Sequence, residues 1–316
     1  MPELGYALSS EEHAPAELVQ NARAAEEAGF GFALISDHYH PWIDAQGHSP
    51  FVWNVIGGIA GATERLRLGT GVTCPIIRTH PAIIAQAAAT SAAMMPGRFF
   101  LGVGSGENLN EHILGDRWPA PDQRLDMLEE AIEVIRLLWQ GGDQTHRGRH
   151  YTVEKARLYT LPDEPPPIAV AASAPKAAEL AGRAGDAFIS VAPDKDLVNT
   201  YKNAGGGDPI YGQVTVCWAR TEEEAKRTAH EVWPNAAIKG DLSQELPQPE
   251  HFEQAAEMVS VEDVAETIVC GPDPDRHLEK IKEYGDAGFT HVYVHQVGRD
   301  QEGFLRFYRE EVLPRA

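Results

Sequence analysis

One sequence unit occurs three times along the chain and limits what the chain can fold into. Each copy has a helix with apolar residues at helical spacing, a glycine near the helix end, and then a short apolar run. Glycine supplies the left-handed residue that ends a helix, and a strand that is apolar on both faces belongs to a parallel sheet covered by helices. The unit therefore predicts a repeated β/α architecture. The three copies are residues 15–38, 177–192 and 278–297.

Five further apolar stretches bring the number of predicted strands to eight. Eight strands that alternate with helices favour a closed (β/α)₈ TIM barrel over an open doubly wound sheet. We expect residues 1–316 to form one domain. Residues 141–167 are expected to form a hairpin with a proline-rich return, and residues 235–260 a lid or an oligomer contact. The further strands are residues 3–8, 66–72, 98–106, 167–173 and 211–219.

The charge balance and the cysteines exclude several classes of function. The net charge is −20, from 27 basic and 47 acidic residues, and it opposes binding to phosphate backbones or anionic membranes. Three widely separated cysteines suggest neither a disulfide framework nor a metal site. The N-terminus lacks the features of a signal peptide, and no apolar run approaches the roughly 18 residues of a membrane span. We expect a cytoplasmic protein that acts on a small molecule.

The active site of a barrel is built at the carboxyl ends of its strands, which gives a short set of candidates. His38 next to Asp37, with Trp42 close by, could act as a general acid or base, or be a structural histidine. Glu107 follows a glycine-rich turn that could approach a ligand, or it could simply begin the next helix. The four strand ends are residues 36–42, 69–73, 102–110 and 172–175.

Other motifs are weak or missing. The string GVGSGE at 102–107 does not have the spacing of a dinucleotide fingerprint, and no GxxxxGK[ST], HExxH or GxSxG is present. Ser173, Ala174 and Pro175 read either as a phosphate-binding helix start or as an ordinary one. His38 and His40 could bind a metal with His295 or Asp186, but three converging ligands are not visible, so no metal is predicted.

Five strings together carry a resemblance to a known family. The chain resembles the deazaflavin-dependent glucose-6-phosphate dehydrogenase group of the luciferase-like oxidoreductases over nearly its whole length. SDHYHPW and the glycine-rich string that ends in ENLNE are the most specific. The strings are SDHYHPW (36–42), LGTGVTCP (68–75), FLGVGSGENLNE (100–111), AGRAGDAFI (181–189) and HQVGRDQEGFLRFY (295–308).

The resemblance implies a luciferase-like barrel that binds coenzyme F420 at its C-terminal mouth and moves a hydride between a substrate carbon and C5 of the deazaflavin. His38 would be the general base and Glu107 the proton partner of the ring. Trp42 would brace the reacting centre, and Glu11 would lie beside the pocket. A homodimer is expected by analogy with related barrels.

The resemblance also implies a set of cofactor-binding residues. A cis peptide between Gly71 and Val72 would lie against the ring. The turn of Ser173 and Ala174 replaces a glycine pair of the family and would hold the phosphate. The full set implied is Asp37, Gly71, Val72, Gly106, Asn110, Ser173 and Ala174.

One departure from the family concerns the substrate. Sugar-phosphate members use cationic side chains for the phosphate, whereas this chain has Gln254, Glu266 and Thr267 in the matching stretches and retains only Lys195. A phosphate dianion would be poorly compensated, so glucose 6-phosphate is predicted to be a poor substrate. A neutral sugar or another secondary alcohol or ketone is expected. The alternatives are an FMN-dependent luciferase-like monooxygenase, against which SDHYHPW argues, and a metal-dependent barrel hydrolase.

Overall fold

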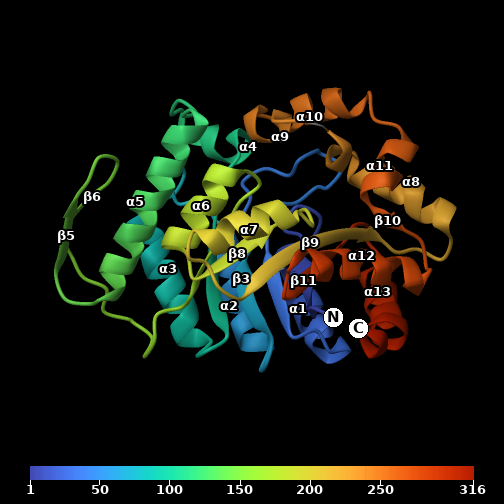
Figure 1. The fold of residues 1–316 in the computed structure, drawn as a ribbon, viewed down its shortest axis with the longest axis horizontal. Helices are drawn as coiled ribbons and strands as arrows, with labels where there is room; N and C mark the ends of the chain where they lie inside the picture. Colours follow the sequence, from blue (N-terminus) through green and yellow to red (C-terminus); the bar gives the residue numbers. More distant parts are fainter. Residues whose placement is uncertain (239) are drawn as a thin grey trace.

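The computed structural model describes residues 1–238 and 240–316, and these residues form a closed barrel of parallel strands (Figure 1). The last barrel strand pairs with both its predecessor and the first strand, which closes the ring. The predicted (β/α)₈ barrel is confirmed. The barrel strands are β1 (Glu3–Leu8), β2 (Phe32–Ile35), β3 (Arg67–Thr70), β4 (Phe99–Val103), β7 (Ile168–Ala171), β8 (Ala187–Ser190), β9 (Ile210–Cys217) and β11 (His291–Gln296).

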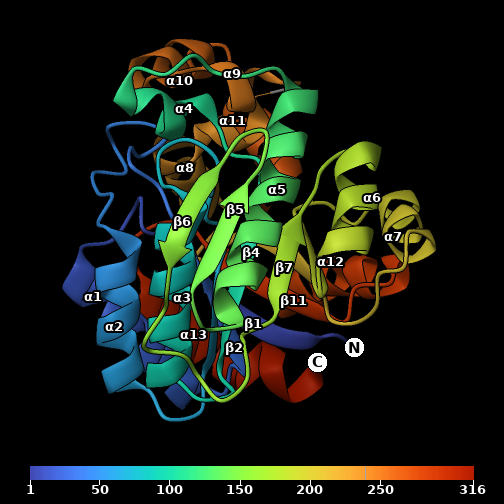
Figure 2. The ribbon, with the colours of Figure 1, turned by 90° about the vertical axis from the view of Figure 1, so that its left-hand side faces the viewer.

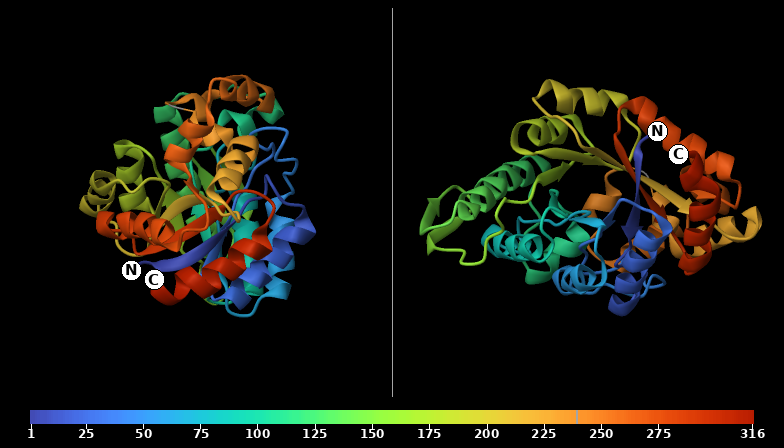
Figure 3. Two further views of the ribbon diagram at one scale, coloured as in Figure 1. Left: turned by 90° about the vertical axis from the view of Figure 1, so that its right-hand side faces the viewer. Right: turned by 90° about the horizontal axis from the view of Figure 1, so that it is seen from below.

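Helices lie around the outside of the strands (Figures 1 and 3). Gly29 has a φ of 108° and ends the first helix, and its amide donates to the carbonyls of Ala25 and Glu26. Gly288, with a φ of 101°, ends the helix before β11 in the same way. Glycine at these positions avoids the steric cost of a left-handed residue. The outer helices are α1 (Pro15–Ala28), α2 (Val52–Ala62), α3 (Pro81–Met94), α5 (Pro121–Trp139), α6 (Pro175–Ala184), α7 (Lys195–Asn203), α8 (Glu222–Val232), α12 (Pro274–Ala287) and α13 (Gln301–Phe307).

Aromatic side chains fill the amino-terminal end of the barrel interior. The rings of Phe100 and Tyr211 stack with centroids 5.0 Å apart, and Phe32 packs edge-on to Tyr211. Strand glycines make room for these rings: a Cβ on Gly5 would lie 2.5 Å from Phe32, and one on Gly69 would collide with Phe100. Alternating small and large residues thus close the lower end of the barrel.

Two segments extend the barrel. The predicted hairpin is present as β5 (Gln144–Arg147) and β6 (Thr152–Ala156), and it lies along α5 in Figure 2. The described residues 234–238 and 240–267 form a mostly helical segment at the carboxyl ends of the strands (Figure 1). That segment comprises η2 (Pro234–Ala237), α9 (Leu242–Glu245), α10 (Pro249–Ala256) and α11 (Val261–Thr267), and a short strand, β10 (Val269–Cys270), follows it and pairs with β9.

The helical segment is attached to the strand-end loops. Phe252 of α10 packs in one cluster with Ile43 and Leu109. The Asn108 side chain donates to the carbonyl of Glu245 at 2.9 Å. The described part of residues 235–260 therefore lies at the mouth, where a lid would lie. None of the described helices is both long enough and apolar enough to cross a membrane.

Candidate active site

Two adjoining cavities open at the carboxyl ends of the strands. The first, named here the His295 cavity, has a volume of about 330 Å³, and the second, the Ser173 cavity, about 360 Å³. They share a wall, so a group on that wall can reach the contents of both. The shared wall consists of His38, Trp42, Gly71, Glu107, Val191, Gln213 and Tyr293.

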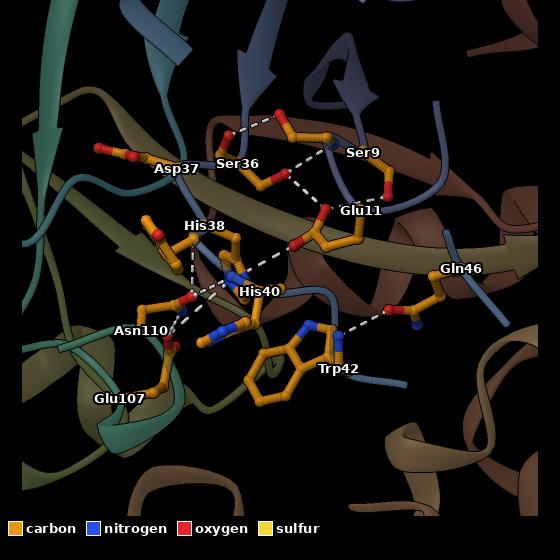
Figure 4. A network of polar contacts seen from close by, with 12 residues as sticks. Ser9, Glu11, Ser36, Asp37, His38, His40, Trp42, Gln46, Glu107 and Asn110 are labelled. Atoms are coloured by element: carbon orange, nitrogen blue, oxygen red, sulfur yellow. Dashed lines mark hydrogen bonds and ion pairs between the residues drawn. The ribbon is translucent and has the colours of Figure 1, made fainter. Parts of the chain in front are cut away.

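His38 follows β2 and is held in one orientation at the shared wall (Figure 4). Its Nδ1 lies 3.2 Å from the carbonyl oxygen of His40, which can only accept a hydrogen bond, so Nδ1 carries the proton of the neutral ring. Nε2 then has a free lone pair. It lies 3.3 Å from Glu11 Oε1 and 3.8 Å from Glu107 Oε2. Two carboxylates therefore stabilise the ring once Nε2 takes a proton, which is the arrangement of a general base.

Glu11 lies in the loop after β1 and is 3% exposed. Its Oε2 accepts hydrogen bonds from the Ser36 hydroxyl at 2.6 Å and the Ser9 hydroxyl at 3.1 Å (Figure 4). Burial raises the pKa of the Glu11 carboxyl, but His38 and the Ser36 hydrogen bond outweigh it, so the pKa lies below its ordinary value. Glu11 is therefore an ionised partner of His38 at neutral pH.

Glu107 and Asn110 connect the loop after β4 with the loop after β2. Asn110 lies in the short helix α4 (Asn108–Glu111), and its amide donates to Glu107 Oε2 at 3.1 Å. Its carbonyl oxygen accepts from the backbone amides of Tyr39 at 2.8 Å and His40 at 3.2 Å. Asn110 thus fixes Glu107 relative to the loop that carries His38. This role is additional to the contact with a cofactor that the sequence predicted for Asn110.

Asp37 is part of a buried charge network that the sequence did not reveal. The Thr73 hydroxyl donates to its Oδ2 at 2.7 Å, and Arg78 donates to its Oδ1 at 3.0 Å. Arg78 also pairs with Glu111 at 3.3 Å. Burial lowers the pKa of Arg78, but the carboxylates of Asp37 and Glu111 more than offset it, so the pKa of Arg78 is raised. Burial also raises the pKa of Glu111, and Arg78 does not fully offset that effect. The charges hold one another in place and fix Asp37 at the Ser173 cavity.

The other predicted residues lie mostly on the cavity walls. The Gly71–Val72 peptide is cis, as expected, and both residues line the Ser173 cavity. The ring of Trp42 lies 5.0 Å from that of His38. Ala174 is the exception, since it stands beside Ser173 at the start of α6 but is not on the wall. No side chain caps α6, so its first amides are left for another acceptor. Gly106 and Ser173 complete the wall.

The suggested metal ligands do not converge. Asp186 precedes β8, at the opposite end of the barrel from His38, and pairs with Arg136 at 2.9 Å. Within residues 1–238 and 240–316 no group of three or more potential ligands is arranged to hold a metal ion. His295 lies at the mouth and lines the cavity that carries its name together with His38.

Of the four residues in the stretches that match the family's phosphate site, one lines a cavity and three do not. Thr267 lines the His295 cavity, whereas Lys195, Gln254 and Glu266 line neither cavity. Lys195 is exposed at the start of α7. Among the described residues that line the His295 cavity there is no Lys or Arg.

Comparisons with known proteins agree with this geometry. The family model for luciferase-like monooxygenases matches residues 1–291. The F420-dependent glucose-6-phosphate dehydrogenase of Nakamurella multipartita is 38% identical over 325 residues, covering 98% of this chain and 95% of the relative. The protein of the same name from Microbacterium testaceum is 37% identical, with 98% and 96% covered.

Solved structures give the same result. An F420-dependent secondary alcohol dehydrogenase in complex with an F420-acetone adduct superposes with a TM-score of 0.91 at 29% identity, covering 99% of this chain and 98% of the other. The coenzyme F420-dependent tetrahydromethanopterin reductase of Methanopyrus kandleri shares the fold, with a TM-score of 0.82 at 22% identity and 99% of each chain covered. The barrel, its strand-end site and these matches together show that the chain belongs to the luciferase-like monooxygenase family.

Proposed function

We propose that the protein is a coenzyme F420-dependent oxidoreductase that moves a hydride between a neutral secondary alcohol, or its ketone, and C5 of the deazaflavin. One observation carries the proposal: His38 Nε2 lies on the wall between two cavities, flanked by Glu11 and Glu107. A hydride donor and its acceptor need adjoining sites with a base at their boundary. Relatives named as F420-dependent dehydrogenases support the same class.

The residues of the Ser173 cavity fit a deazaflavin. Val72, Ala171 and Ile189 supply an apolar surface for a flat ring. The carboxylate of Asp37 is fixed at the same cavity, and the free amides at the start of α6 suit a phosphate. When bound there, the deazaflavin supplies a carbon that accepts or donates a hydride.

The residues of the shared wall handle the proton. During oxidation His38 Nε2 would take the proton of the substrate hydroxyl while the alcohol carbon would give up its hydride to the cofactor, which would leave the ketone. Glu11 and Glu107 stabilise the positive charge on the ring of His38. In the reverse direction His38 returns the proton to the oxygen. Trp42 covers the reacting centre beside His38, and Glu107 is the proton partner on the cofactor side.

The charge of the His295 cavity favours a neutral substrate. Two carboxylates, Glu11 and Glu107, line it, and no Lys or Arg is present among its described lining residues. A phosphate dianion would enter without a compensating cation. We therefore infer that glucose 6-phosphate is a poor substrate here, although relatives carry that substrate in their names. The FMN-dependent monooxygenase is the less supported alternative.

A paired binding and turnover experiment tests the proposal. The purified protein is titrated with oxidised F420 and, separately, with FMN, and fluorescence is followed. F420 is then mixed with 2-butanol or glucose 6-phosphate, and its reduction is followed by absorbance. Saturable F420 binding and reduction by the neutral alcohol are expected. Preference for FMN, or binding of neither, would contradict the proposal, and efficient turnover of glucose 6-phosphate would contradict the inferred substrate class.

A further inference from the structure

A second pair of a histidine and a carboxylate lies at the His295 cavity, which His295 lines and Glu12 supports from behind. His295, near the end of β11, is 3% exposed, and its Nε2 lies 3.4 Å from Glu12 Oε2. Glu12 Oε1 accepts from the amide of Gly298 at 2.8 Å, so the carboxylate is fixed from both sides. The role described above for His38 and Glu11 does not use this pair.

The strand order explains why the two pairs stand side by side. β1 pairs with β2 on one side and with β11 on the other. The loop after β1 therefore lies between the ends of those strands, and its consecutive carboxylates face different histidines, Glu11 to His38 and Glu12 to His295. A molecule that fills the His295 cavity reaches from one histidine to the other, because both line it.

His295 has unused hydrogen-bonding capacity. Its Nδ1 is buried and has no hydrogen-bond partner in the part of the chain that the structure describes. With Nε2 turned to the Glu12 carboxylate, Nδ1 is the ring nitrogen that no protein group uses. Buried polar atoms are nearly always paired, and an exception calls for an explanation. The Trp233 ring packs edge-on against the imidazole with centroids 4.5 Å apart and holds it in place.

Besides the carboxylate of Glu12, uncharged polar side chains lie near His295. Thr215 of β9 is its register partner across the parallel ladder, and side chains of partners in register point to the same side. Asn235 and Thr267 line the same cavity. Hydroxyl and amide groups at this end suit a ligand that carries hydroxyl groups of its own.

We propose that His295, positioned by Glu12, and Thr215 form a subsite for a second hydroxyl of the substrate, so that the enzyme prefers a neutral diol, polyol or sugar to an alcohol with one oxygen. The inference rests on the proposed function, since the first hydroxyl is the one at His38. Glu12 is a positioning residue, and His295 and Thr215 determine specificity. Acetone, the ketone of the adduct in the solved dehydrogenase, carries a single oxygen and so would not use such a subsite.

A matched pair of substrates tests the subsite. 2-Butanol and 2,3-butanediol differ by one hydroxyl, and kcat and KM are measured for both with saturating F420. We expect the wild-type enzyme to have the higher kcat/KM for the diol. His295→Phe and Thr215→Val should each lower kcat/KM for the diol by about tenfold, mainly through KM, as expected for the loss of one hydrogen bond. Turnover of 2-butanol should change by less than about twofold.

The control lies on the same strand. His291, at the other end of β11, pairs with Glu3 at 3.2 Å and lines neither cavity, so His291→Phe should leave the preference for the diol intact. Equal losses for both alcohols in the His295 and Thr215 variants, with F420 binding retained, would overturn the subsite. So would a wild-type preference for 2-butanol. Failure of the wild-type protein to bind F420 would instead reject the proposed function. Thr215→Val, which keeps the shape of the side chain, decides the matter if His295→Phe does not fold.

Discussion

Two histidines of this barrel have similar surroundings and different positions. His38 and His295 each face a carboxylate from the loop after β1, at 3.3 and 3.4 Å, and both side chains are nearly buried. His38 lies on the wall between the two cavities, whereas His295 lines only one of them. In the function proposed here, the position relative to the two cavities, more than the pairing, separates the histidine that moves a proton from the histidine that recognises the substrate.

Replacing His38 should have the largest effect. His38→Ala removes the base at the shared wall, and kcat should fall by about 10²–10⁴-fold because general acid–base catalysis contributes that much. The dissociation constant for F420, measured by fluorescence, should change little. If His38→Ala lost cofactor binding and kept its turnover at saturation, the comparison with His295 would be wrong.

Exchanging the carboxylates one at a time should give a smaller and more informative effect. Glu11→Gln removes the charge that stabilises protonated His38, so kcat for both alcohols should fall by about 10- to 100-fold. Glu12→Gln should raise KM for the diol and leave kcat for 2-butanol within about twofold. Steady-state kinetics on the two variants side by side would show whether the two neighbouring acids serve different histidines. Identical profiles would reject that division.

A third histidine, His277, extends the comparison of His38 and His295, and its replacement should have the smallest effect on turnover. His277 uses both ring nitrogens within the protein, with Tyr308 Oη at 2.9 Å and the Gly271 carbonyl at 3.0 Å. Burial lowers the pKa of His277 from 6.5 to about 4. Because the pKa of His277 is lower in the folded than in the unfolded protein, the neutral ring stabilises the fold above pH 6.5. As the pH falls toward 4, the free energy of unfolding should drop by up to roughly 3 kcal/mol.

The test of His277 is urea unfolding at several pH values. Between pH 7 and pH 4.5 the wild-type free energy of unfolding should fall more steeply than that of His277→Gln, which cannot titrate. Turnover of the variant at neutral pH should stay close to wild type, because His277 lines neither cavity. Parallel stability curves for the two proteins would show that His277 does not titrate in this range.

Much of the fold could be predicted because it follows local rules. Apolar runs, three of them preceded by a helix and a glycine, predicted the eight barrel strands, and the hairpin at 141–167 was expected. The two-residue strand β10 was missed, since its pairing with β9 depends on where the helical segment returns the chain. A strand so short has too few residues for a recognisable pattern.

The positions of the candidate site residues could be predicted where they follow a strand directly. His38 and Glu107 were found from their places at strand ends. Arg78 was missed because it lies well beyond β3, and its importance comes from Asp37 and Glu111, which are distant in sequence. The role of His295 depends on its pairing with Glu12, some 283 residues away, and on Thr215 of a neighbouring strand. Partners of this kind are set by barrel closure, which no short string encodes.

The aromatic rings packed against Gly5 and Gly69 close the amino-terminal end of the barrel. Substrate, product and cofactor must all pass through the carboxyl end, beneath the helical segment that holds Phe252 and Glu245. Substrate entry and product release therefore use the same route, and a bound cofactor narrows that route for the substrate. Exchanging residues 234–267 between relatives would thus change the rates of substrate entry and product release and leave the aromatic residues at the closed end of the barrel unchanged.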